Sequence, residues 1–257
     1  MTSNPLTSQE IISALQAALE PLDYVNAAWL GGSAAFNRAD QWSDIDLMVD
    51  AADERVEEIL PRIETTLQAL SPIDLKFEVP RPTWHGHIQT IYRLERASPY
   101  LLIDVAVLKS SSLNKFLEPE IHGQAVVLFD KTGVVQPPPL DRQALQEKLR
   151  ARLGYLRTVF DLFQILTLKE LNRGSYLDAL QYYFSFTLRP LVEALRIQHD
   201  PARHDFGARY LYADLPRPLA ERVEQLYFVC DGEDLRRKRA EAESWFYEVM
   251  DQIRLEA

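Results

Sequence analysis

A run of three prolines divides this chain into two parts. The segment at residues 130–139, DKTGVVQPPP, places a turn signal before prolines that can continue neither a helix nor a central strand. The spacing of apolar residues is mixed before this segment and helical after it. With 257 residues, 47% of them hydrophobic, the chain is long enough for sizeable packed cores. We therefore expect two domains, at residues 1–135 and 136–257.

The first part combines helical and strand patterns. Thr7 and Glu10 have the spacing of a capping box at the start of an apolar helical stripe. A second helical stretch, residues 53–70, contains Pro61, which is expected to kink or split it. Short apolar runs typical of strands occupy residues 25–30, 45–49, 74–79, 88–94 and 100–108. This part is expected to be α/β or α+β with about five strands.

The second part has helical periodicity throughout. Apolar residues recur every three or four positions in four stripes, at residues 145–163, 177–195, 219–226 and 235–253. Arg189-Pro190 is expected to kink the second of these helices. Four amphipathic helices with short connections predict an antiparallel bundle.

The net charge of −10 comes entirely from the first part. Residues 1–130 hold 9 basic and 19 acidic side chains, whereas residues 131–257 hold 19 of each. Such an excess repels phosphate and makes nucleic acid an unlikely partner, but it suits metal ions or a cationic substrate. The single Cys230 excludes an internal disulfide, and neither a membrane span nor a signal peptide is visible. We expect a soluble, cytoplasmic protein.

A glycine-rich turn follows the first expected strand. Gly31, Gly32 and Ser33 precede a probable helix, so free backbone N–H groups and the Ser33 hydroxyl are available to an anion such as phosphate. Turns of this composition are common, and by itself this one is weak evidence.

Three acidic residues point to a metal. Asp44 and Asp46 are two residues apart on an expected strand, so their carboxylates project from one face and repel each other unless a cation lies between them. An isolated Asp-x-Asp is more often a solvated strand face. Asp104, however, interrupts an apolar strand, where an ionised carboxylate needs an ion pair, for example with Arg93 or Arg96, an exposed strand end, or a metal. A divalent ion shared by all three acids accounts for them together.

These residues resemble a known superfamily. Gly32-Ser33, ten intervening residues, Asp44-Ile45-Asp46 and a later Asp104 in a hydrophobic strand are similar to the motif of the nucleotidyltransferases that include DNA polymerase β. The resemblance covers roughly residues 25–110. The following helical region is similar in layout to the aminoglycoside and other small-molecule nucleotidyltransferases, an analogy of architecture.

The resemblance implies an α+β fold, with a mixed β-sheet flanked by helices and then a helical bundle. It implies a catalytic domain at residues 1–135 and a substrate- and nucleotide-closing domain at residues 136–257. Gly32 and Ser33 would grip the phosphates of a nucleoside triphosphate. Asp44 and Asp46 would bind two Mg²⁺ ions, and Asp104 would bind the catalytic ion and help to deprotonate an attacking hydroxyl.

Other polar residues have weaker cases. Arg203 and Arg209 lie in a polar interruption between helices and are candidate phosphate or substrate contacts. His85 and His87 are expected to be ordinary loop histidines, because too few further ligands accompany them for a metal site. Glu78 and Glu95 are further acids in the first part, and neither is assigned a role.

The expected activity is transfer of a nucleoside monophosphate, AMP from ATP in the first instance, to a hydroxyl of a small molecule such as an aminoglycoside, with release of pyrophosphate. One alternative keeps the chemistry and changes the acceptor to a protein side chain, as in antitoxin-like members. Another is a non-catalytic nucleotide-binding module, which the complete set of Ser33, Asp44, Asp46 and Asp104 disfavours. The sequence leaves open a monomer or a homodimer, the acceptor and the preferred base.

Overall fold

The computed structural model describes residues 5–255, and the chain forms two compact units. The first unit ends at Leu140 and the second begins at Asp141. The sequence placed the boundary at residues 135–136, just before the prolines, and the units divide immediately after them. No helix among residues 5–255 is long and apolar enough to cross a membrane.

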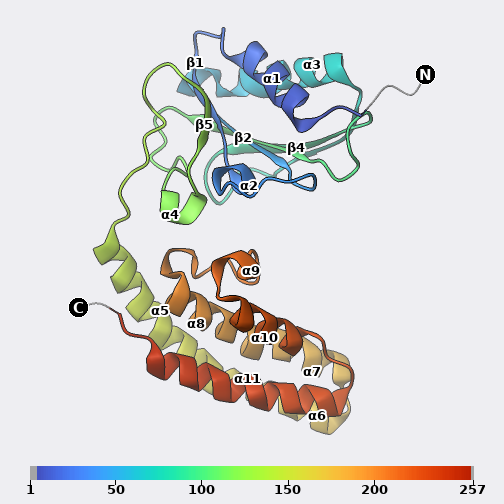
Figure 1. Cartoon of the computed structure of the whole chain (residues 1–257), viewed down its shortest axis with the longest axis vertical. Helices are drawn as coiled ribbons and strands as arrows, with labels where there is room; N and C mark the ends of the chain where they lie inside the picture. Colours follow the sequence, from blue (N-terminus) through green and yellow to red (C-terminus); the bar gives the residue numbers. More distant parts are fainter. Residues whose placement is uncertain (1–4, 256–257) are drawn as a thin grey trace. The chain divides into compact units, whose positions relative to one another are not determined.

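The first unit is built on one mixed sheet of six strands (Figure 1). Its strands lie in the order β3-β4-β5-β2-β1-β6, and only β2 and β5 pair in parallel. The strands are β1 (Val25–Leu30), β2 (Ile45–Ala51), β3 (Ile73–Glu78), β4 (Ile88–Leu94), β5 (Ile103–Lys109) and β6 (Val126–Asp130).

Two helices cover one face of this sheet. They are α1 (Ser8–Leu19) and α3 (Ile59–Leu70), and both lie on the same side of the strands in Figure 1. Ile11 and Leu15 of α1 pack with Ile63 of α3 and with Leu47 and Val105 from the strands. Because side chains alternate across a strand, Asp46 and Asp104 project from the opposite face.

The opposite face carries shorter elements. The one-turn helices α2 (Gly32–Ala35) and α4 (Pro119–His122) lie on the other side of the strands from α1 and α3 in Figure 1, whereas the 3₁₀ turn η1 (Asp53–Glu58) leads into α3 and packs its Val56 in the core of that face. A small apolar cluster of Ala27, Trp29, Ala106, Leu108 and Leu117 packs here. The face that bears the acids is therefore partly apolar and partly polar.

Two expectations for this unit need correction. The sheet has six strands rather than about five, because β6 pairs with β1 along the edge of the sheet. Val126 and Val127 on β6 are exposed, so the strand lacks the alternation that would have revealed it. The helical stretch of residues 53–70 is split, but Pro61 does not break it: it lies in the first turn of α3, where its missing N–H has no helical partner to lose.

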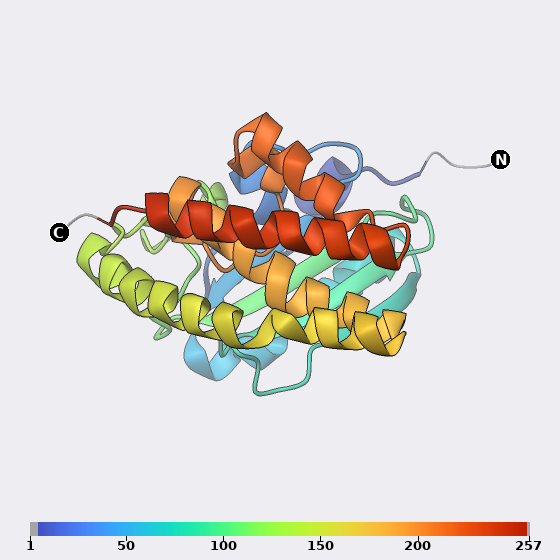
Figure 2. The same cartoon turned by 90° about the horizontal axis from the view of Figure 1, so that it is seen from below.

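The second unit is entirely helical. Its longer helices follow the four expected stripes, with additional short helices between them. Figure 2 shows α5 and α6 following one another along the unit, and α11 packs against α6, α7 and α8. The helices are α5 (Arg142–Phe163), α6 (Ile165–Arg173), α7 (Tyr176–Tyr183), α8 (Arg189–His199), α9 (Leu211–Asp214), α10 (Arg217–Tyr227) and α11 (Gly232–Gln252).

The helix break expected at Arg189-Pro190 takes a particular form. Residues Phe184–Leu188 make one π-helical segment between α7 and α8, and Pro190 lies at the start of α8. A proline inside an α-helix removes one hydrogen bond and crowds the preceding turn, and a wider π turn accommodates both effects. The α+β class predicted from the sequence is confirmed: a mixed sheet with helices in the first unit, and helices alone in the second.

Candidate active site

Asp46 and Asp104 are direct neighbours on the sheet. The parallel pairing of β2 with β5 places Asp46 opposite Asp104, with Leu47 opposite Val105 as the next pair. Residues opposite each other on adjacent strands project from the same face. The two carboxylates therefore lie side by side on the face that α1 and α3 leave uncovered.

Asp44 completes the group from just before β2. Its Oδ1 accepts a hydrogen bond from the Leu102 backbone N–H at 3.0 Å, which ties the start of β2 to the residue before β5. Burial raises the pKa of Asp104, and the nearby negative charge of Asp44 raises it further. The structure thus brings together the three acids that the sequence singled out.

The glycine turn touches one of these acids. Gly32 has a φ of +53°, and a Cβ atom there would lie 1.7 Å from Asp46 Oδ2. The Gly31 N–H donates to the Asp46 carbonyl oxygen at 2.9 Å. A side chain at position 32 would collide with the carboxylate, so glycine is required both for the backbone conformation and for the close approach.

Ser33 follows Gly32 within α2, and both residues are half-buried. Its carbonyl oxygen accepts the Arg38 N–H at 2.9 Å, which closes the turn after α2. Ser33 therefore lies next in the chain to the glycine that contacts Asp46. The phosphate-binding role of Gly32 and Ser33 stays a prediction.

Asp104 has a polar partner that the sequence did not reveal. Gln89 Nε2 on β4 donates to both carboxylate oxygens of Asp104, at 2.9 Å and 2.8 Å. His85 Nε2 lies 3.2 Å from Gln89 Oε1, on the far side of the same amide. Within residues 5–255, no lysine or arginine forms an ion pair with Asp104 or Asp44. The alternative of a salt bridge from Arg93 is excluded, because Arg93 pairs with Asp74.

The two histidines of the loop before β4 are packed against other rings. The His85 and His87 rings stack with centroids 5.0 Å apart, and Phe116 lies edge-on to both. Burial, and then the charge on His85, lowers the pKa of His87 to about 4. His85 is linked to Asp104 through the Gln89 side chain. His87 stacks on the His85 ring and is neutral at pH 7.

The donor set suits a hard divalent cation in chemistry. Asp44, Asp46 and Asp104 offer only carboxylate oxygens, which Mg²⁺ and Ca²⁺ prefer. Glycine at position 32 avoids the collision that any side chain there would make with Asp46 Oδ2. No group of three or more Asp, Glu, His or Cys side chains in residues 5–255 is arranged so that it could hold a metal ion. The oxygens of Asp44 and Asp104 instead accept the hydrogen bonds described above.

Glu78 is not part of this group. It ends the edge strand β3, and its carboxylate pairs with Lys76 at 2.6 Å. Glu95 lies just beyond β4 and is exposed. Neither carboxylate forms a contact with Asp44 or Asp104 that would support a role as a base.

Arg203 and Arg209 belong to the second unit. Arg203 is buried, with Nε 2.8 Å from Asp200 Oδ2 and Nη1 3.1 Å from Asp214 Oδ1. Its guanidinium is part of an ion-pair network that also contains the fully buried Arg196. Arg209 is exposed, and its guanidinium lies over the rings of Phe206 and Tyr210.

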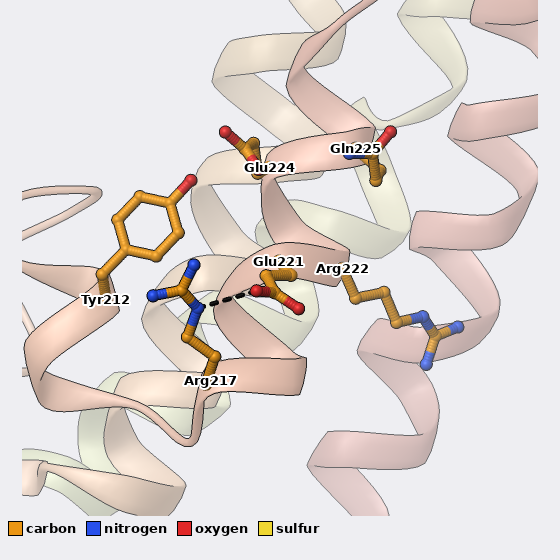
Figure 3. Close-up of a pocket in the computed structure, with 6 residues that line it drawn as sticks. All are labelled: Tyr212, Arg217, Glu221, Arg222, Glu224 and Gln225. Carbon is orange, nitrogen blue, oxygen red and sulfur yellow. Dashed lines mark hydrogen bonds and ion pairs between the residues drawn. The ribbon is translucent and has the colours of Figure 1, made fainter.

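A cavity of about 620 Å³ lies within the second unit and is drawn in Figure 3. Arg217 Nε donates to Glu221 Oε1 at 2.7 Å, one turn along α10, and Tyr212 lies beside the same guanidinium. Arg222 is directed to Trp245 and Glu241. The charges that line this cavity neutralise one another, and it contains none of the three site acids.

Comparisons with known proteins give distant structural similarities only. No protein-family model matches the sequence, and no curated protein matches it. An aminoglycoside 6-adenyltransferase from Bacillus subtilis aligns at 13% identity with a TM-score of 0.38, covering 96% of this chain and 89% of that one. A spectinomycin adenyltransferase from Enterococcus faecialis, solved with ATP and spectinomycin, aligns at 11% identity and a TM-score of 0.37, covering 94% and 100%.

A third solved structure is a cyclic dinucleotide synthase from Elizabethkingia meningoseptica with GTP and Apcpp. It aligns at 14% identity with a TM-score of 0.29, covering 93% of this chain and 90% of that one. Since TM-scores below 0.5 do not establish a common fold, the function of this chain has to be argued from its own residues.

Proposed function

We propose that this protein is a Mg²⁺-dependent nucleotidyltransferase. The observation that carries the proposal is the side-by-side placement of Asp46 and Asp104 on parallel strands, with Asp44 close by and the Gly32 turn packed on Asp46. Neither Asp44 nor Asp104 forms an ion pair with a lysine or arginine among residues 5–255. Their carboxylates therefore repel each other, and a cationic ligand would relieve that repulsion.

The residues divide the work as follows. The backbone at Gly32 and the Ser33 hydroxyl would bind the phosphates of a nucleoside triphosphate. Asp44, Asp46 and Asp104 would hold two Mg²⁺ ions. When bound, the ions would neutralise phosphate charge and lower the pKa of an attacking hydroxyl.

In the reaction, the acceptor oxygen forms a bond to the α-phosphorus while the bond from that phosphorus to the pyrophosphate oxygen breaks. The hydroxyl proton would pass to Asp104, the carboxylate assigned beside the attacking hydroxyl. Pyrophosphate leaves and the nucleoside monophosphate stays on the acceptor. Positioning supplies most of the acceleration.

The nucleotide and acceptor are finer parts of the proposal. ATP is the first nucleotide to test, and a small hydroxylated molecule is the first acceptor. The first part of the chain has ten more acidic than basic side chains, which favours a polycationic acceptor such as an aminoglycoside. Arg209 stays a candidate for a phosphate or substrate contact. We do not retain Arg203, because Asp200 and Asp214 engage its guanidinium.

The test combines binding and turnover. The full-length protein is melted with Mg²⁺ and each of the four nucleoside triphosphates, and pyrophosphate release is followed with a panel of aminoglycosides and other hydroxylated metabolites. We expect at least one nucleotide to raise the melting temperature. We expect Asp46→Asn to lower transfer by about 1,000-fold, since losing several kcal/mol of charge stabilisation has that effect.

Asp23→Asn is the matched control, because Asp23 is an exposed acid of the same unit away from the site strands. It should melt and turn over like the wild type. Radiolabelled triphosphate incubated with the protein and then with cell lysate would reveal a protein acceptor instead. No thermal shift with any of the four nucleotides, together with no pyrophosphate release, would remove the enzymatic assignment.

A further inference from the structure

We propose that Gln89 is a positioning residue for Asp104, and that His85 fixes the direction in which the Gln89 amide points. The inference rests on the proposed function. It gives a role to two residues, Gln89 and His85, that are outside the nucleotidyltransferase motif and are not among the three acids. It depends on three contacts in one row: His87 backbone to His85, His85 to Gln89, and Gln89 to Asp104.

The strand register places Gln89 beside Asp104. β4 and β5 pair antiparallel, with Ile91 opposite Asp104 and Gln89 opposite Ala106. Gln89 and Ile91 are two residues apart, so Gln89 projects from the face that carries Asp104. It occupies the diagonal neighbour position, which is within reach of a long side chain.

Hydrogen-bond chemistry fixes the orientation of the amide. One nitrogen, Gln89 Nε2, reaches both oxygens of the Asp104 carboxylate, at 2.9 Å and 2.8 Å. A carboxylate only accepts hydrogen bonds, so the opposite orientation would place the amide oxygen against two negatively charged oxygens. Gln89 Oε1 must therefore point toward His85.

The Gln89 amide in turn determines which ring nitrogen of His85 carries the proton. Gln89 Oε1 can only accept, so His85 Nε2, 3.2 Å away, must carry the hydrogen. His85 Nδ1 is then the acceptor, and it receives the His87 backbone N–H at 3.1 Å. Every group in the row has a partner of the right kind, from the backbone at His87 to the Asp104 carboxylate.

This arrangement orients Asp104 without neutralising it. A lysine or arginine at the Gln89 position would hold the carboxylate equally well but would cancel the charge that a metal ion or an acceptor proton needs. A neutral amide restricts rotation of the carboxylate and leaves the charge in place. Carboxylates in metal sites commonly depend on such hydrogen-bonding partners, whose loss lowers activity or affinity by roughly 10- to 100-fold.

The experiment compares four variants of the full-length protein. Gln89→Leu removes the donor at similar volume, and His85→Leu removes the group that orients the amide. His85→Gln keeps an amide donor near the position of Nε2. Gln68→Leu, on the exposed face of α3, is the matched control for the chemical change. A thermal melt without ligands establishes that each variant folds.

For turnover, we expect Gln89→Leu to lower kcat roughly 10- to 100-fold while KM for the nucleotide changes less than about threefold. His85→Leu should lower kcat about tenfold, His85→Gln should recover part of that loss, and Gln68→Leu should match the wild type. An unchanged kcat in Gln89→Leu, in a wild-type protein that is active, would overturn the positioning role alone.

A second readout does not depend on activity. In ¹⁵N NMR spectra of the ligand-free protein, we expect His85 to carry its proton on Nε2, with slow exchange that Gln89→Leu accelerates and Gln68→Leu does not. A proton on Nδ1 of His85 would overturn the proposed row of contacts. If the wild type shows no nucleotide binding and no transfer, the proposed function fails, whatever the His85 spectrum shows.

Discussion

Two acids on neighbouring strands of one sheet are treated very differently. Asp50, near the end of β2, is completely buried and receives Lys115 Nζ at 2.5 Å and Asn26 Nδ2 at 2.8 Å. Asp104, near the start of β5, is partly buried and receives only the neutral amide of Gln89. The same sheet thus cancels one charge and preserves the other.

The second unit also pairs a buried acid with basic side chains, as the first unit does for Asp50. Asp214 is buried with Arg196 Nη1 at 3.1 Å and Arg203 Nη1 at 3.1 Å, so its charge is compensated twice. Burying an ion requires such compensation unless another group supplies it. The contrast teaches that acids serving only the fold are neutralised by the fold, whereas Asp104 has no lysine or arginine partner among residues 5–255, as its proposed metal-binding role would require.

The largest expected effect tests the neutralised end of this comparison. Lys115→Met leaves Asp50 buried without its cation, so the free energy of unfolding in urea should fall by about 3–5 kcal/mol. Lys109→Met, at the exposed end of β5, is the control and should change it by less than about 0.5 kcal/mol. An equally small change in Lys115→Met would mean that the stability of the fold does not depend on the ion pair between Lys115 and Asp50.

A smaller effect is expected where the backbone approaches an acid. Gly32→Ala strains a residue with φ of +53° and places Cβ 1.7 Å from Asp46 Oδ2, so we expect a loss of about 2–3 kcal/mol and displacement of the carboxylate. Gly174→Ala has a φ of +75° but nothing within 4 Å, so it should show strain alone, about 1–2 kcal/mol.

The excess of Gly32→Ala over Gly174→Ala in urea unfolding measures the contact with Asp46. If the two glycines gave equal losses, and Gly32→Ala kept its transfer activity, the turn and the acid would be independent of each other.

A pH dependence should come from the histidine behind the site. Burial, and then the charge on His85, lowers the pKa of His87 to about 4 from an ordinary value near 6.5. The unfolded chain therefore binds the extra proton between these values, and stability is lost as the pH falls from about 6.5 toward 4. We expect a loss on the order of 1–2 kcal/mol that His87→Phe largely removes and that His199→Phe, at an exposed position, does not.

The smallest effect has the opposite sign. Burial and the charge of Asp44 raise the pKa of Asp104, so its ionised form is less favourable in the folded protein than in the unfolded chain. Asp104→Asn should therefore raise the free energy of unfolding at pH 7, without divalent ions, by up to about 1 kcal/mol while transfer activity is lost.

That gain should shrink as the pH falls below the ordinary aspartate pKa of about 4, where the wild-type carboxyl becomes protonated in both states. Asp50→Asn, which leaves Lys115 without its partner, should be destabilising in the same assay. A destabilising Asp104→Asn at pH 7 would place Asp104 with Asp50, among the acids that the fold requires.

Local patterns in the sequence predicted five of the six strands, and they placed the three acids on or beside two of these strands. The alternation around Asp46 and the apolar run around Asp104 specify strands, and the proline segment specifies the division into units. The edge strand β6 was missed because Val126 and Val127 are exposed and adjacent, so its residues have no alternation to read.

The partners of the acids were not accessible from the sequence. Gln89 resembles any polar strand residue until the register of β4 against β5 is known, and that register is a tertiary property. For Arg203 the sequence suggested a role that the fold does not support. It is a cation in a polar loop of the sequence and was predicted to contact phosphate or substrate, but folding buries it against Asp214. The charge of a residue is visible in the sequence, whereas the group that compensates it is not.

The parallel pairing of β2 with β5 also bears on how the protein matures. Asp44 and Leu102, which form a hydrogen bond at the start of these strands, are 58 residues apart in the sequence. The segment between them contains α3, β3 and β4. Contacts so distant along the chain form late and slowly. A newly made chain would hold its glycine turn early, yet it would stay catalytically silent until β5 docks, so recovery of turnover should lag behind recovery of helical signal during refolding.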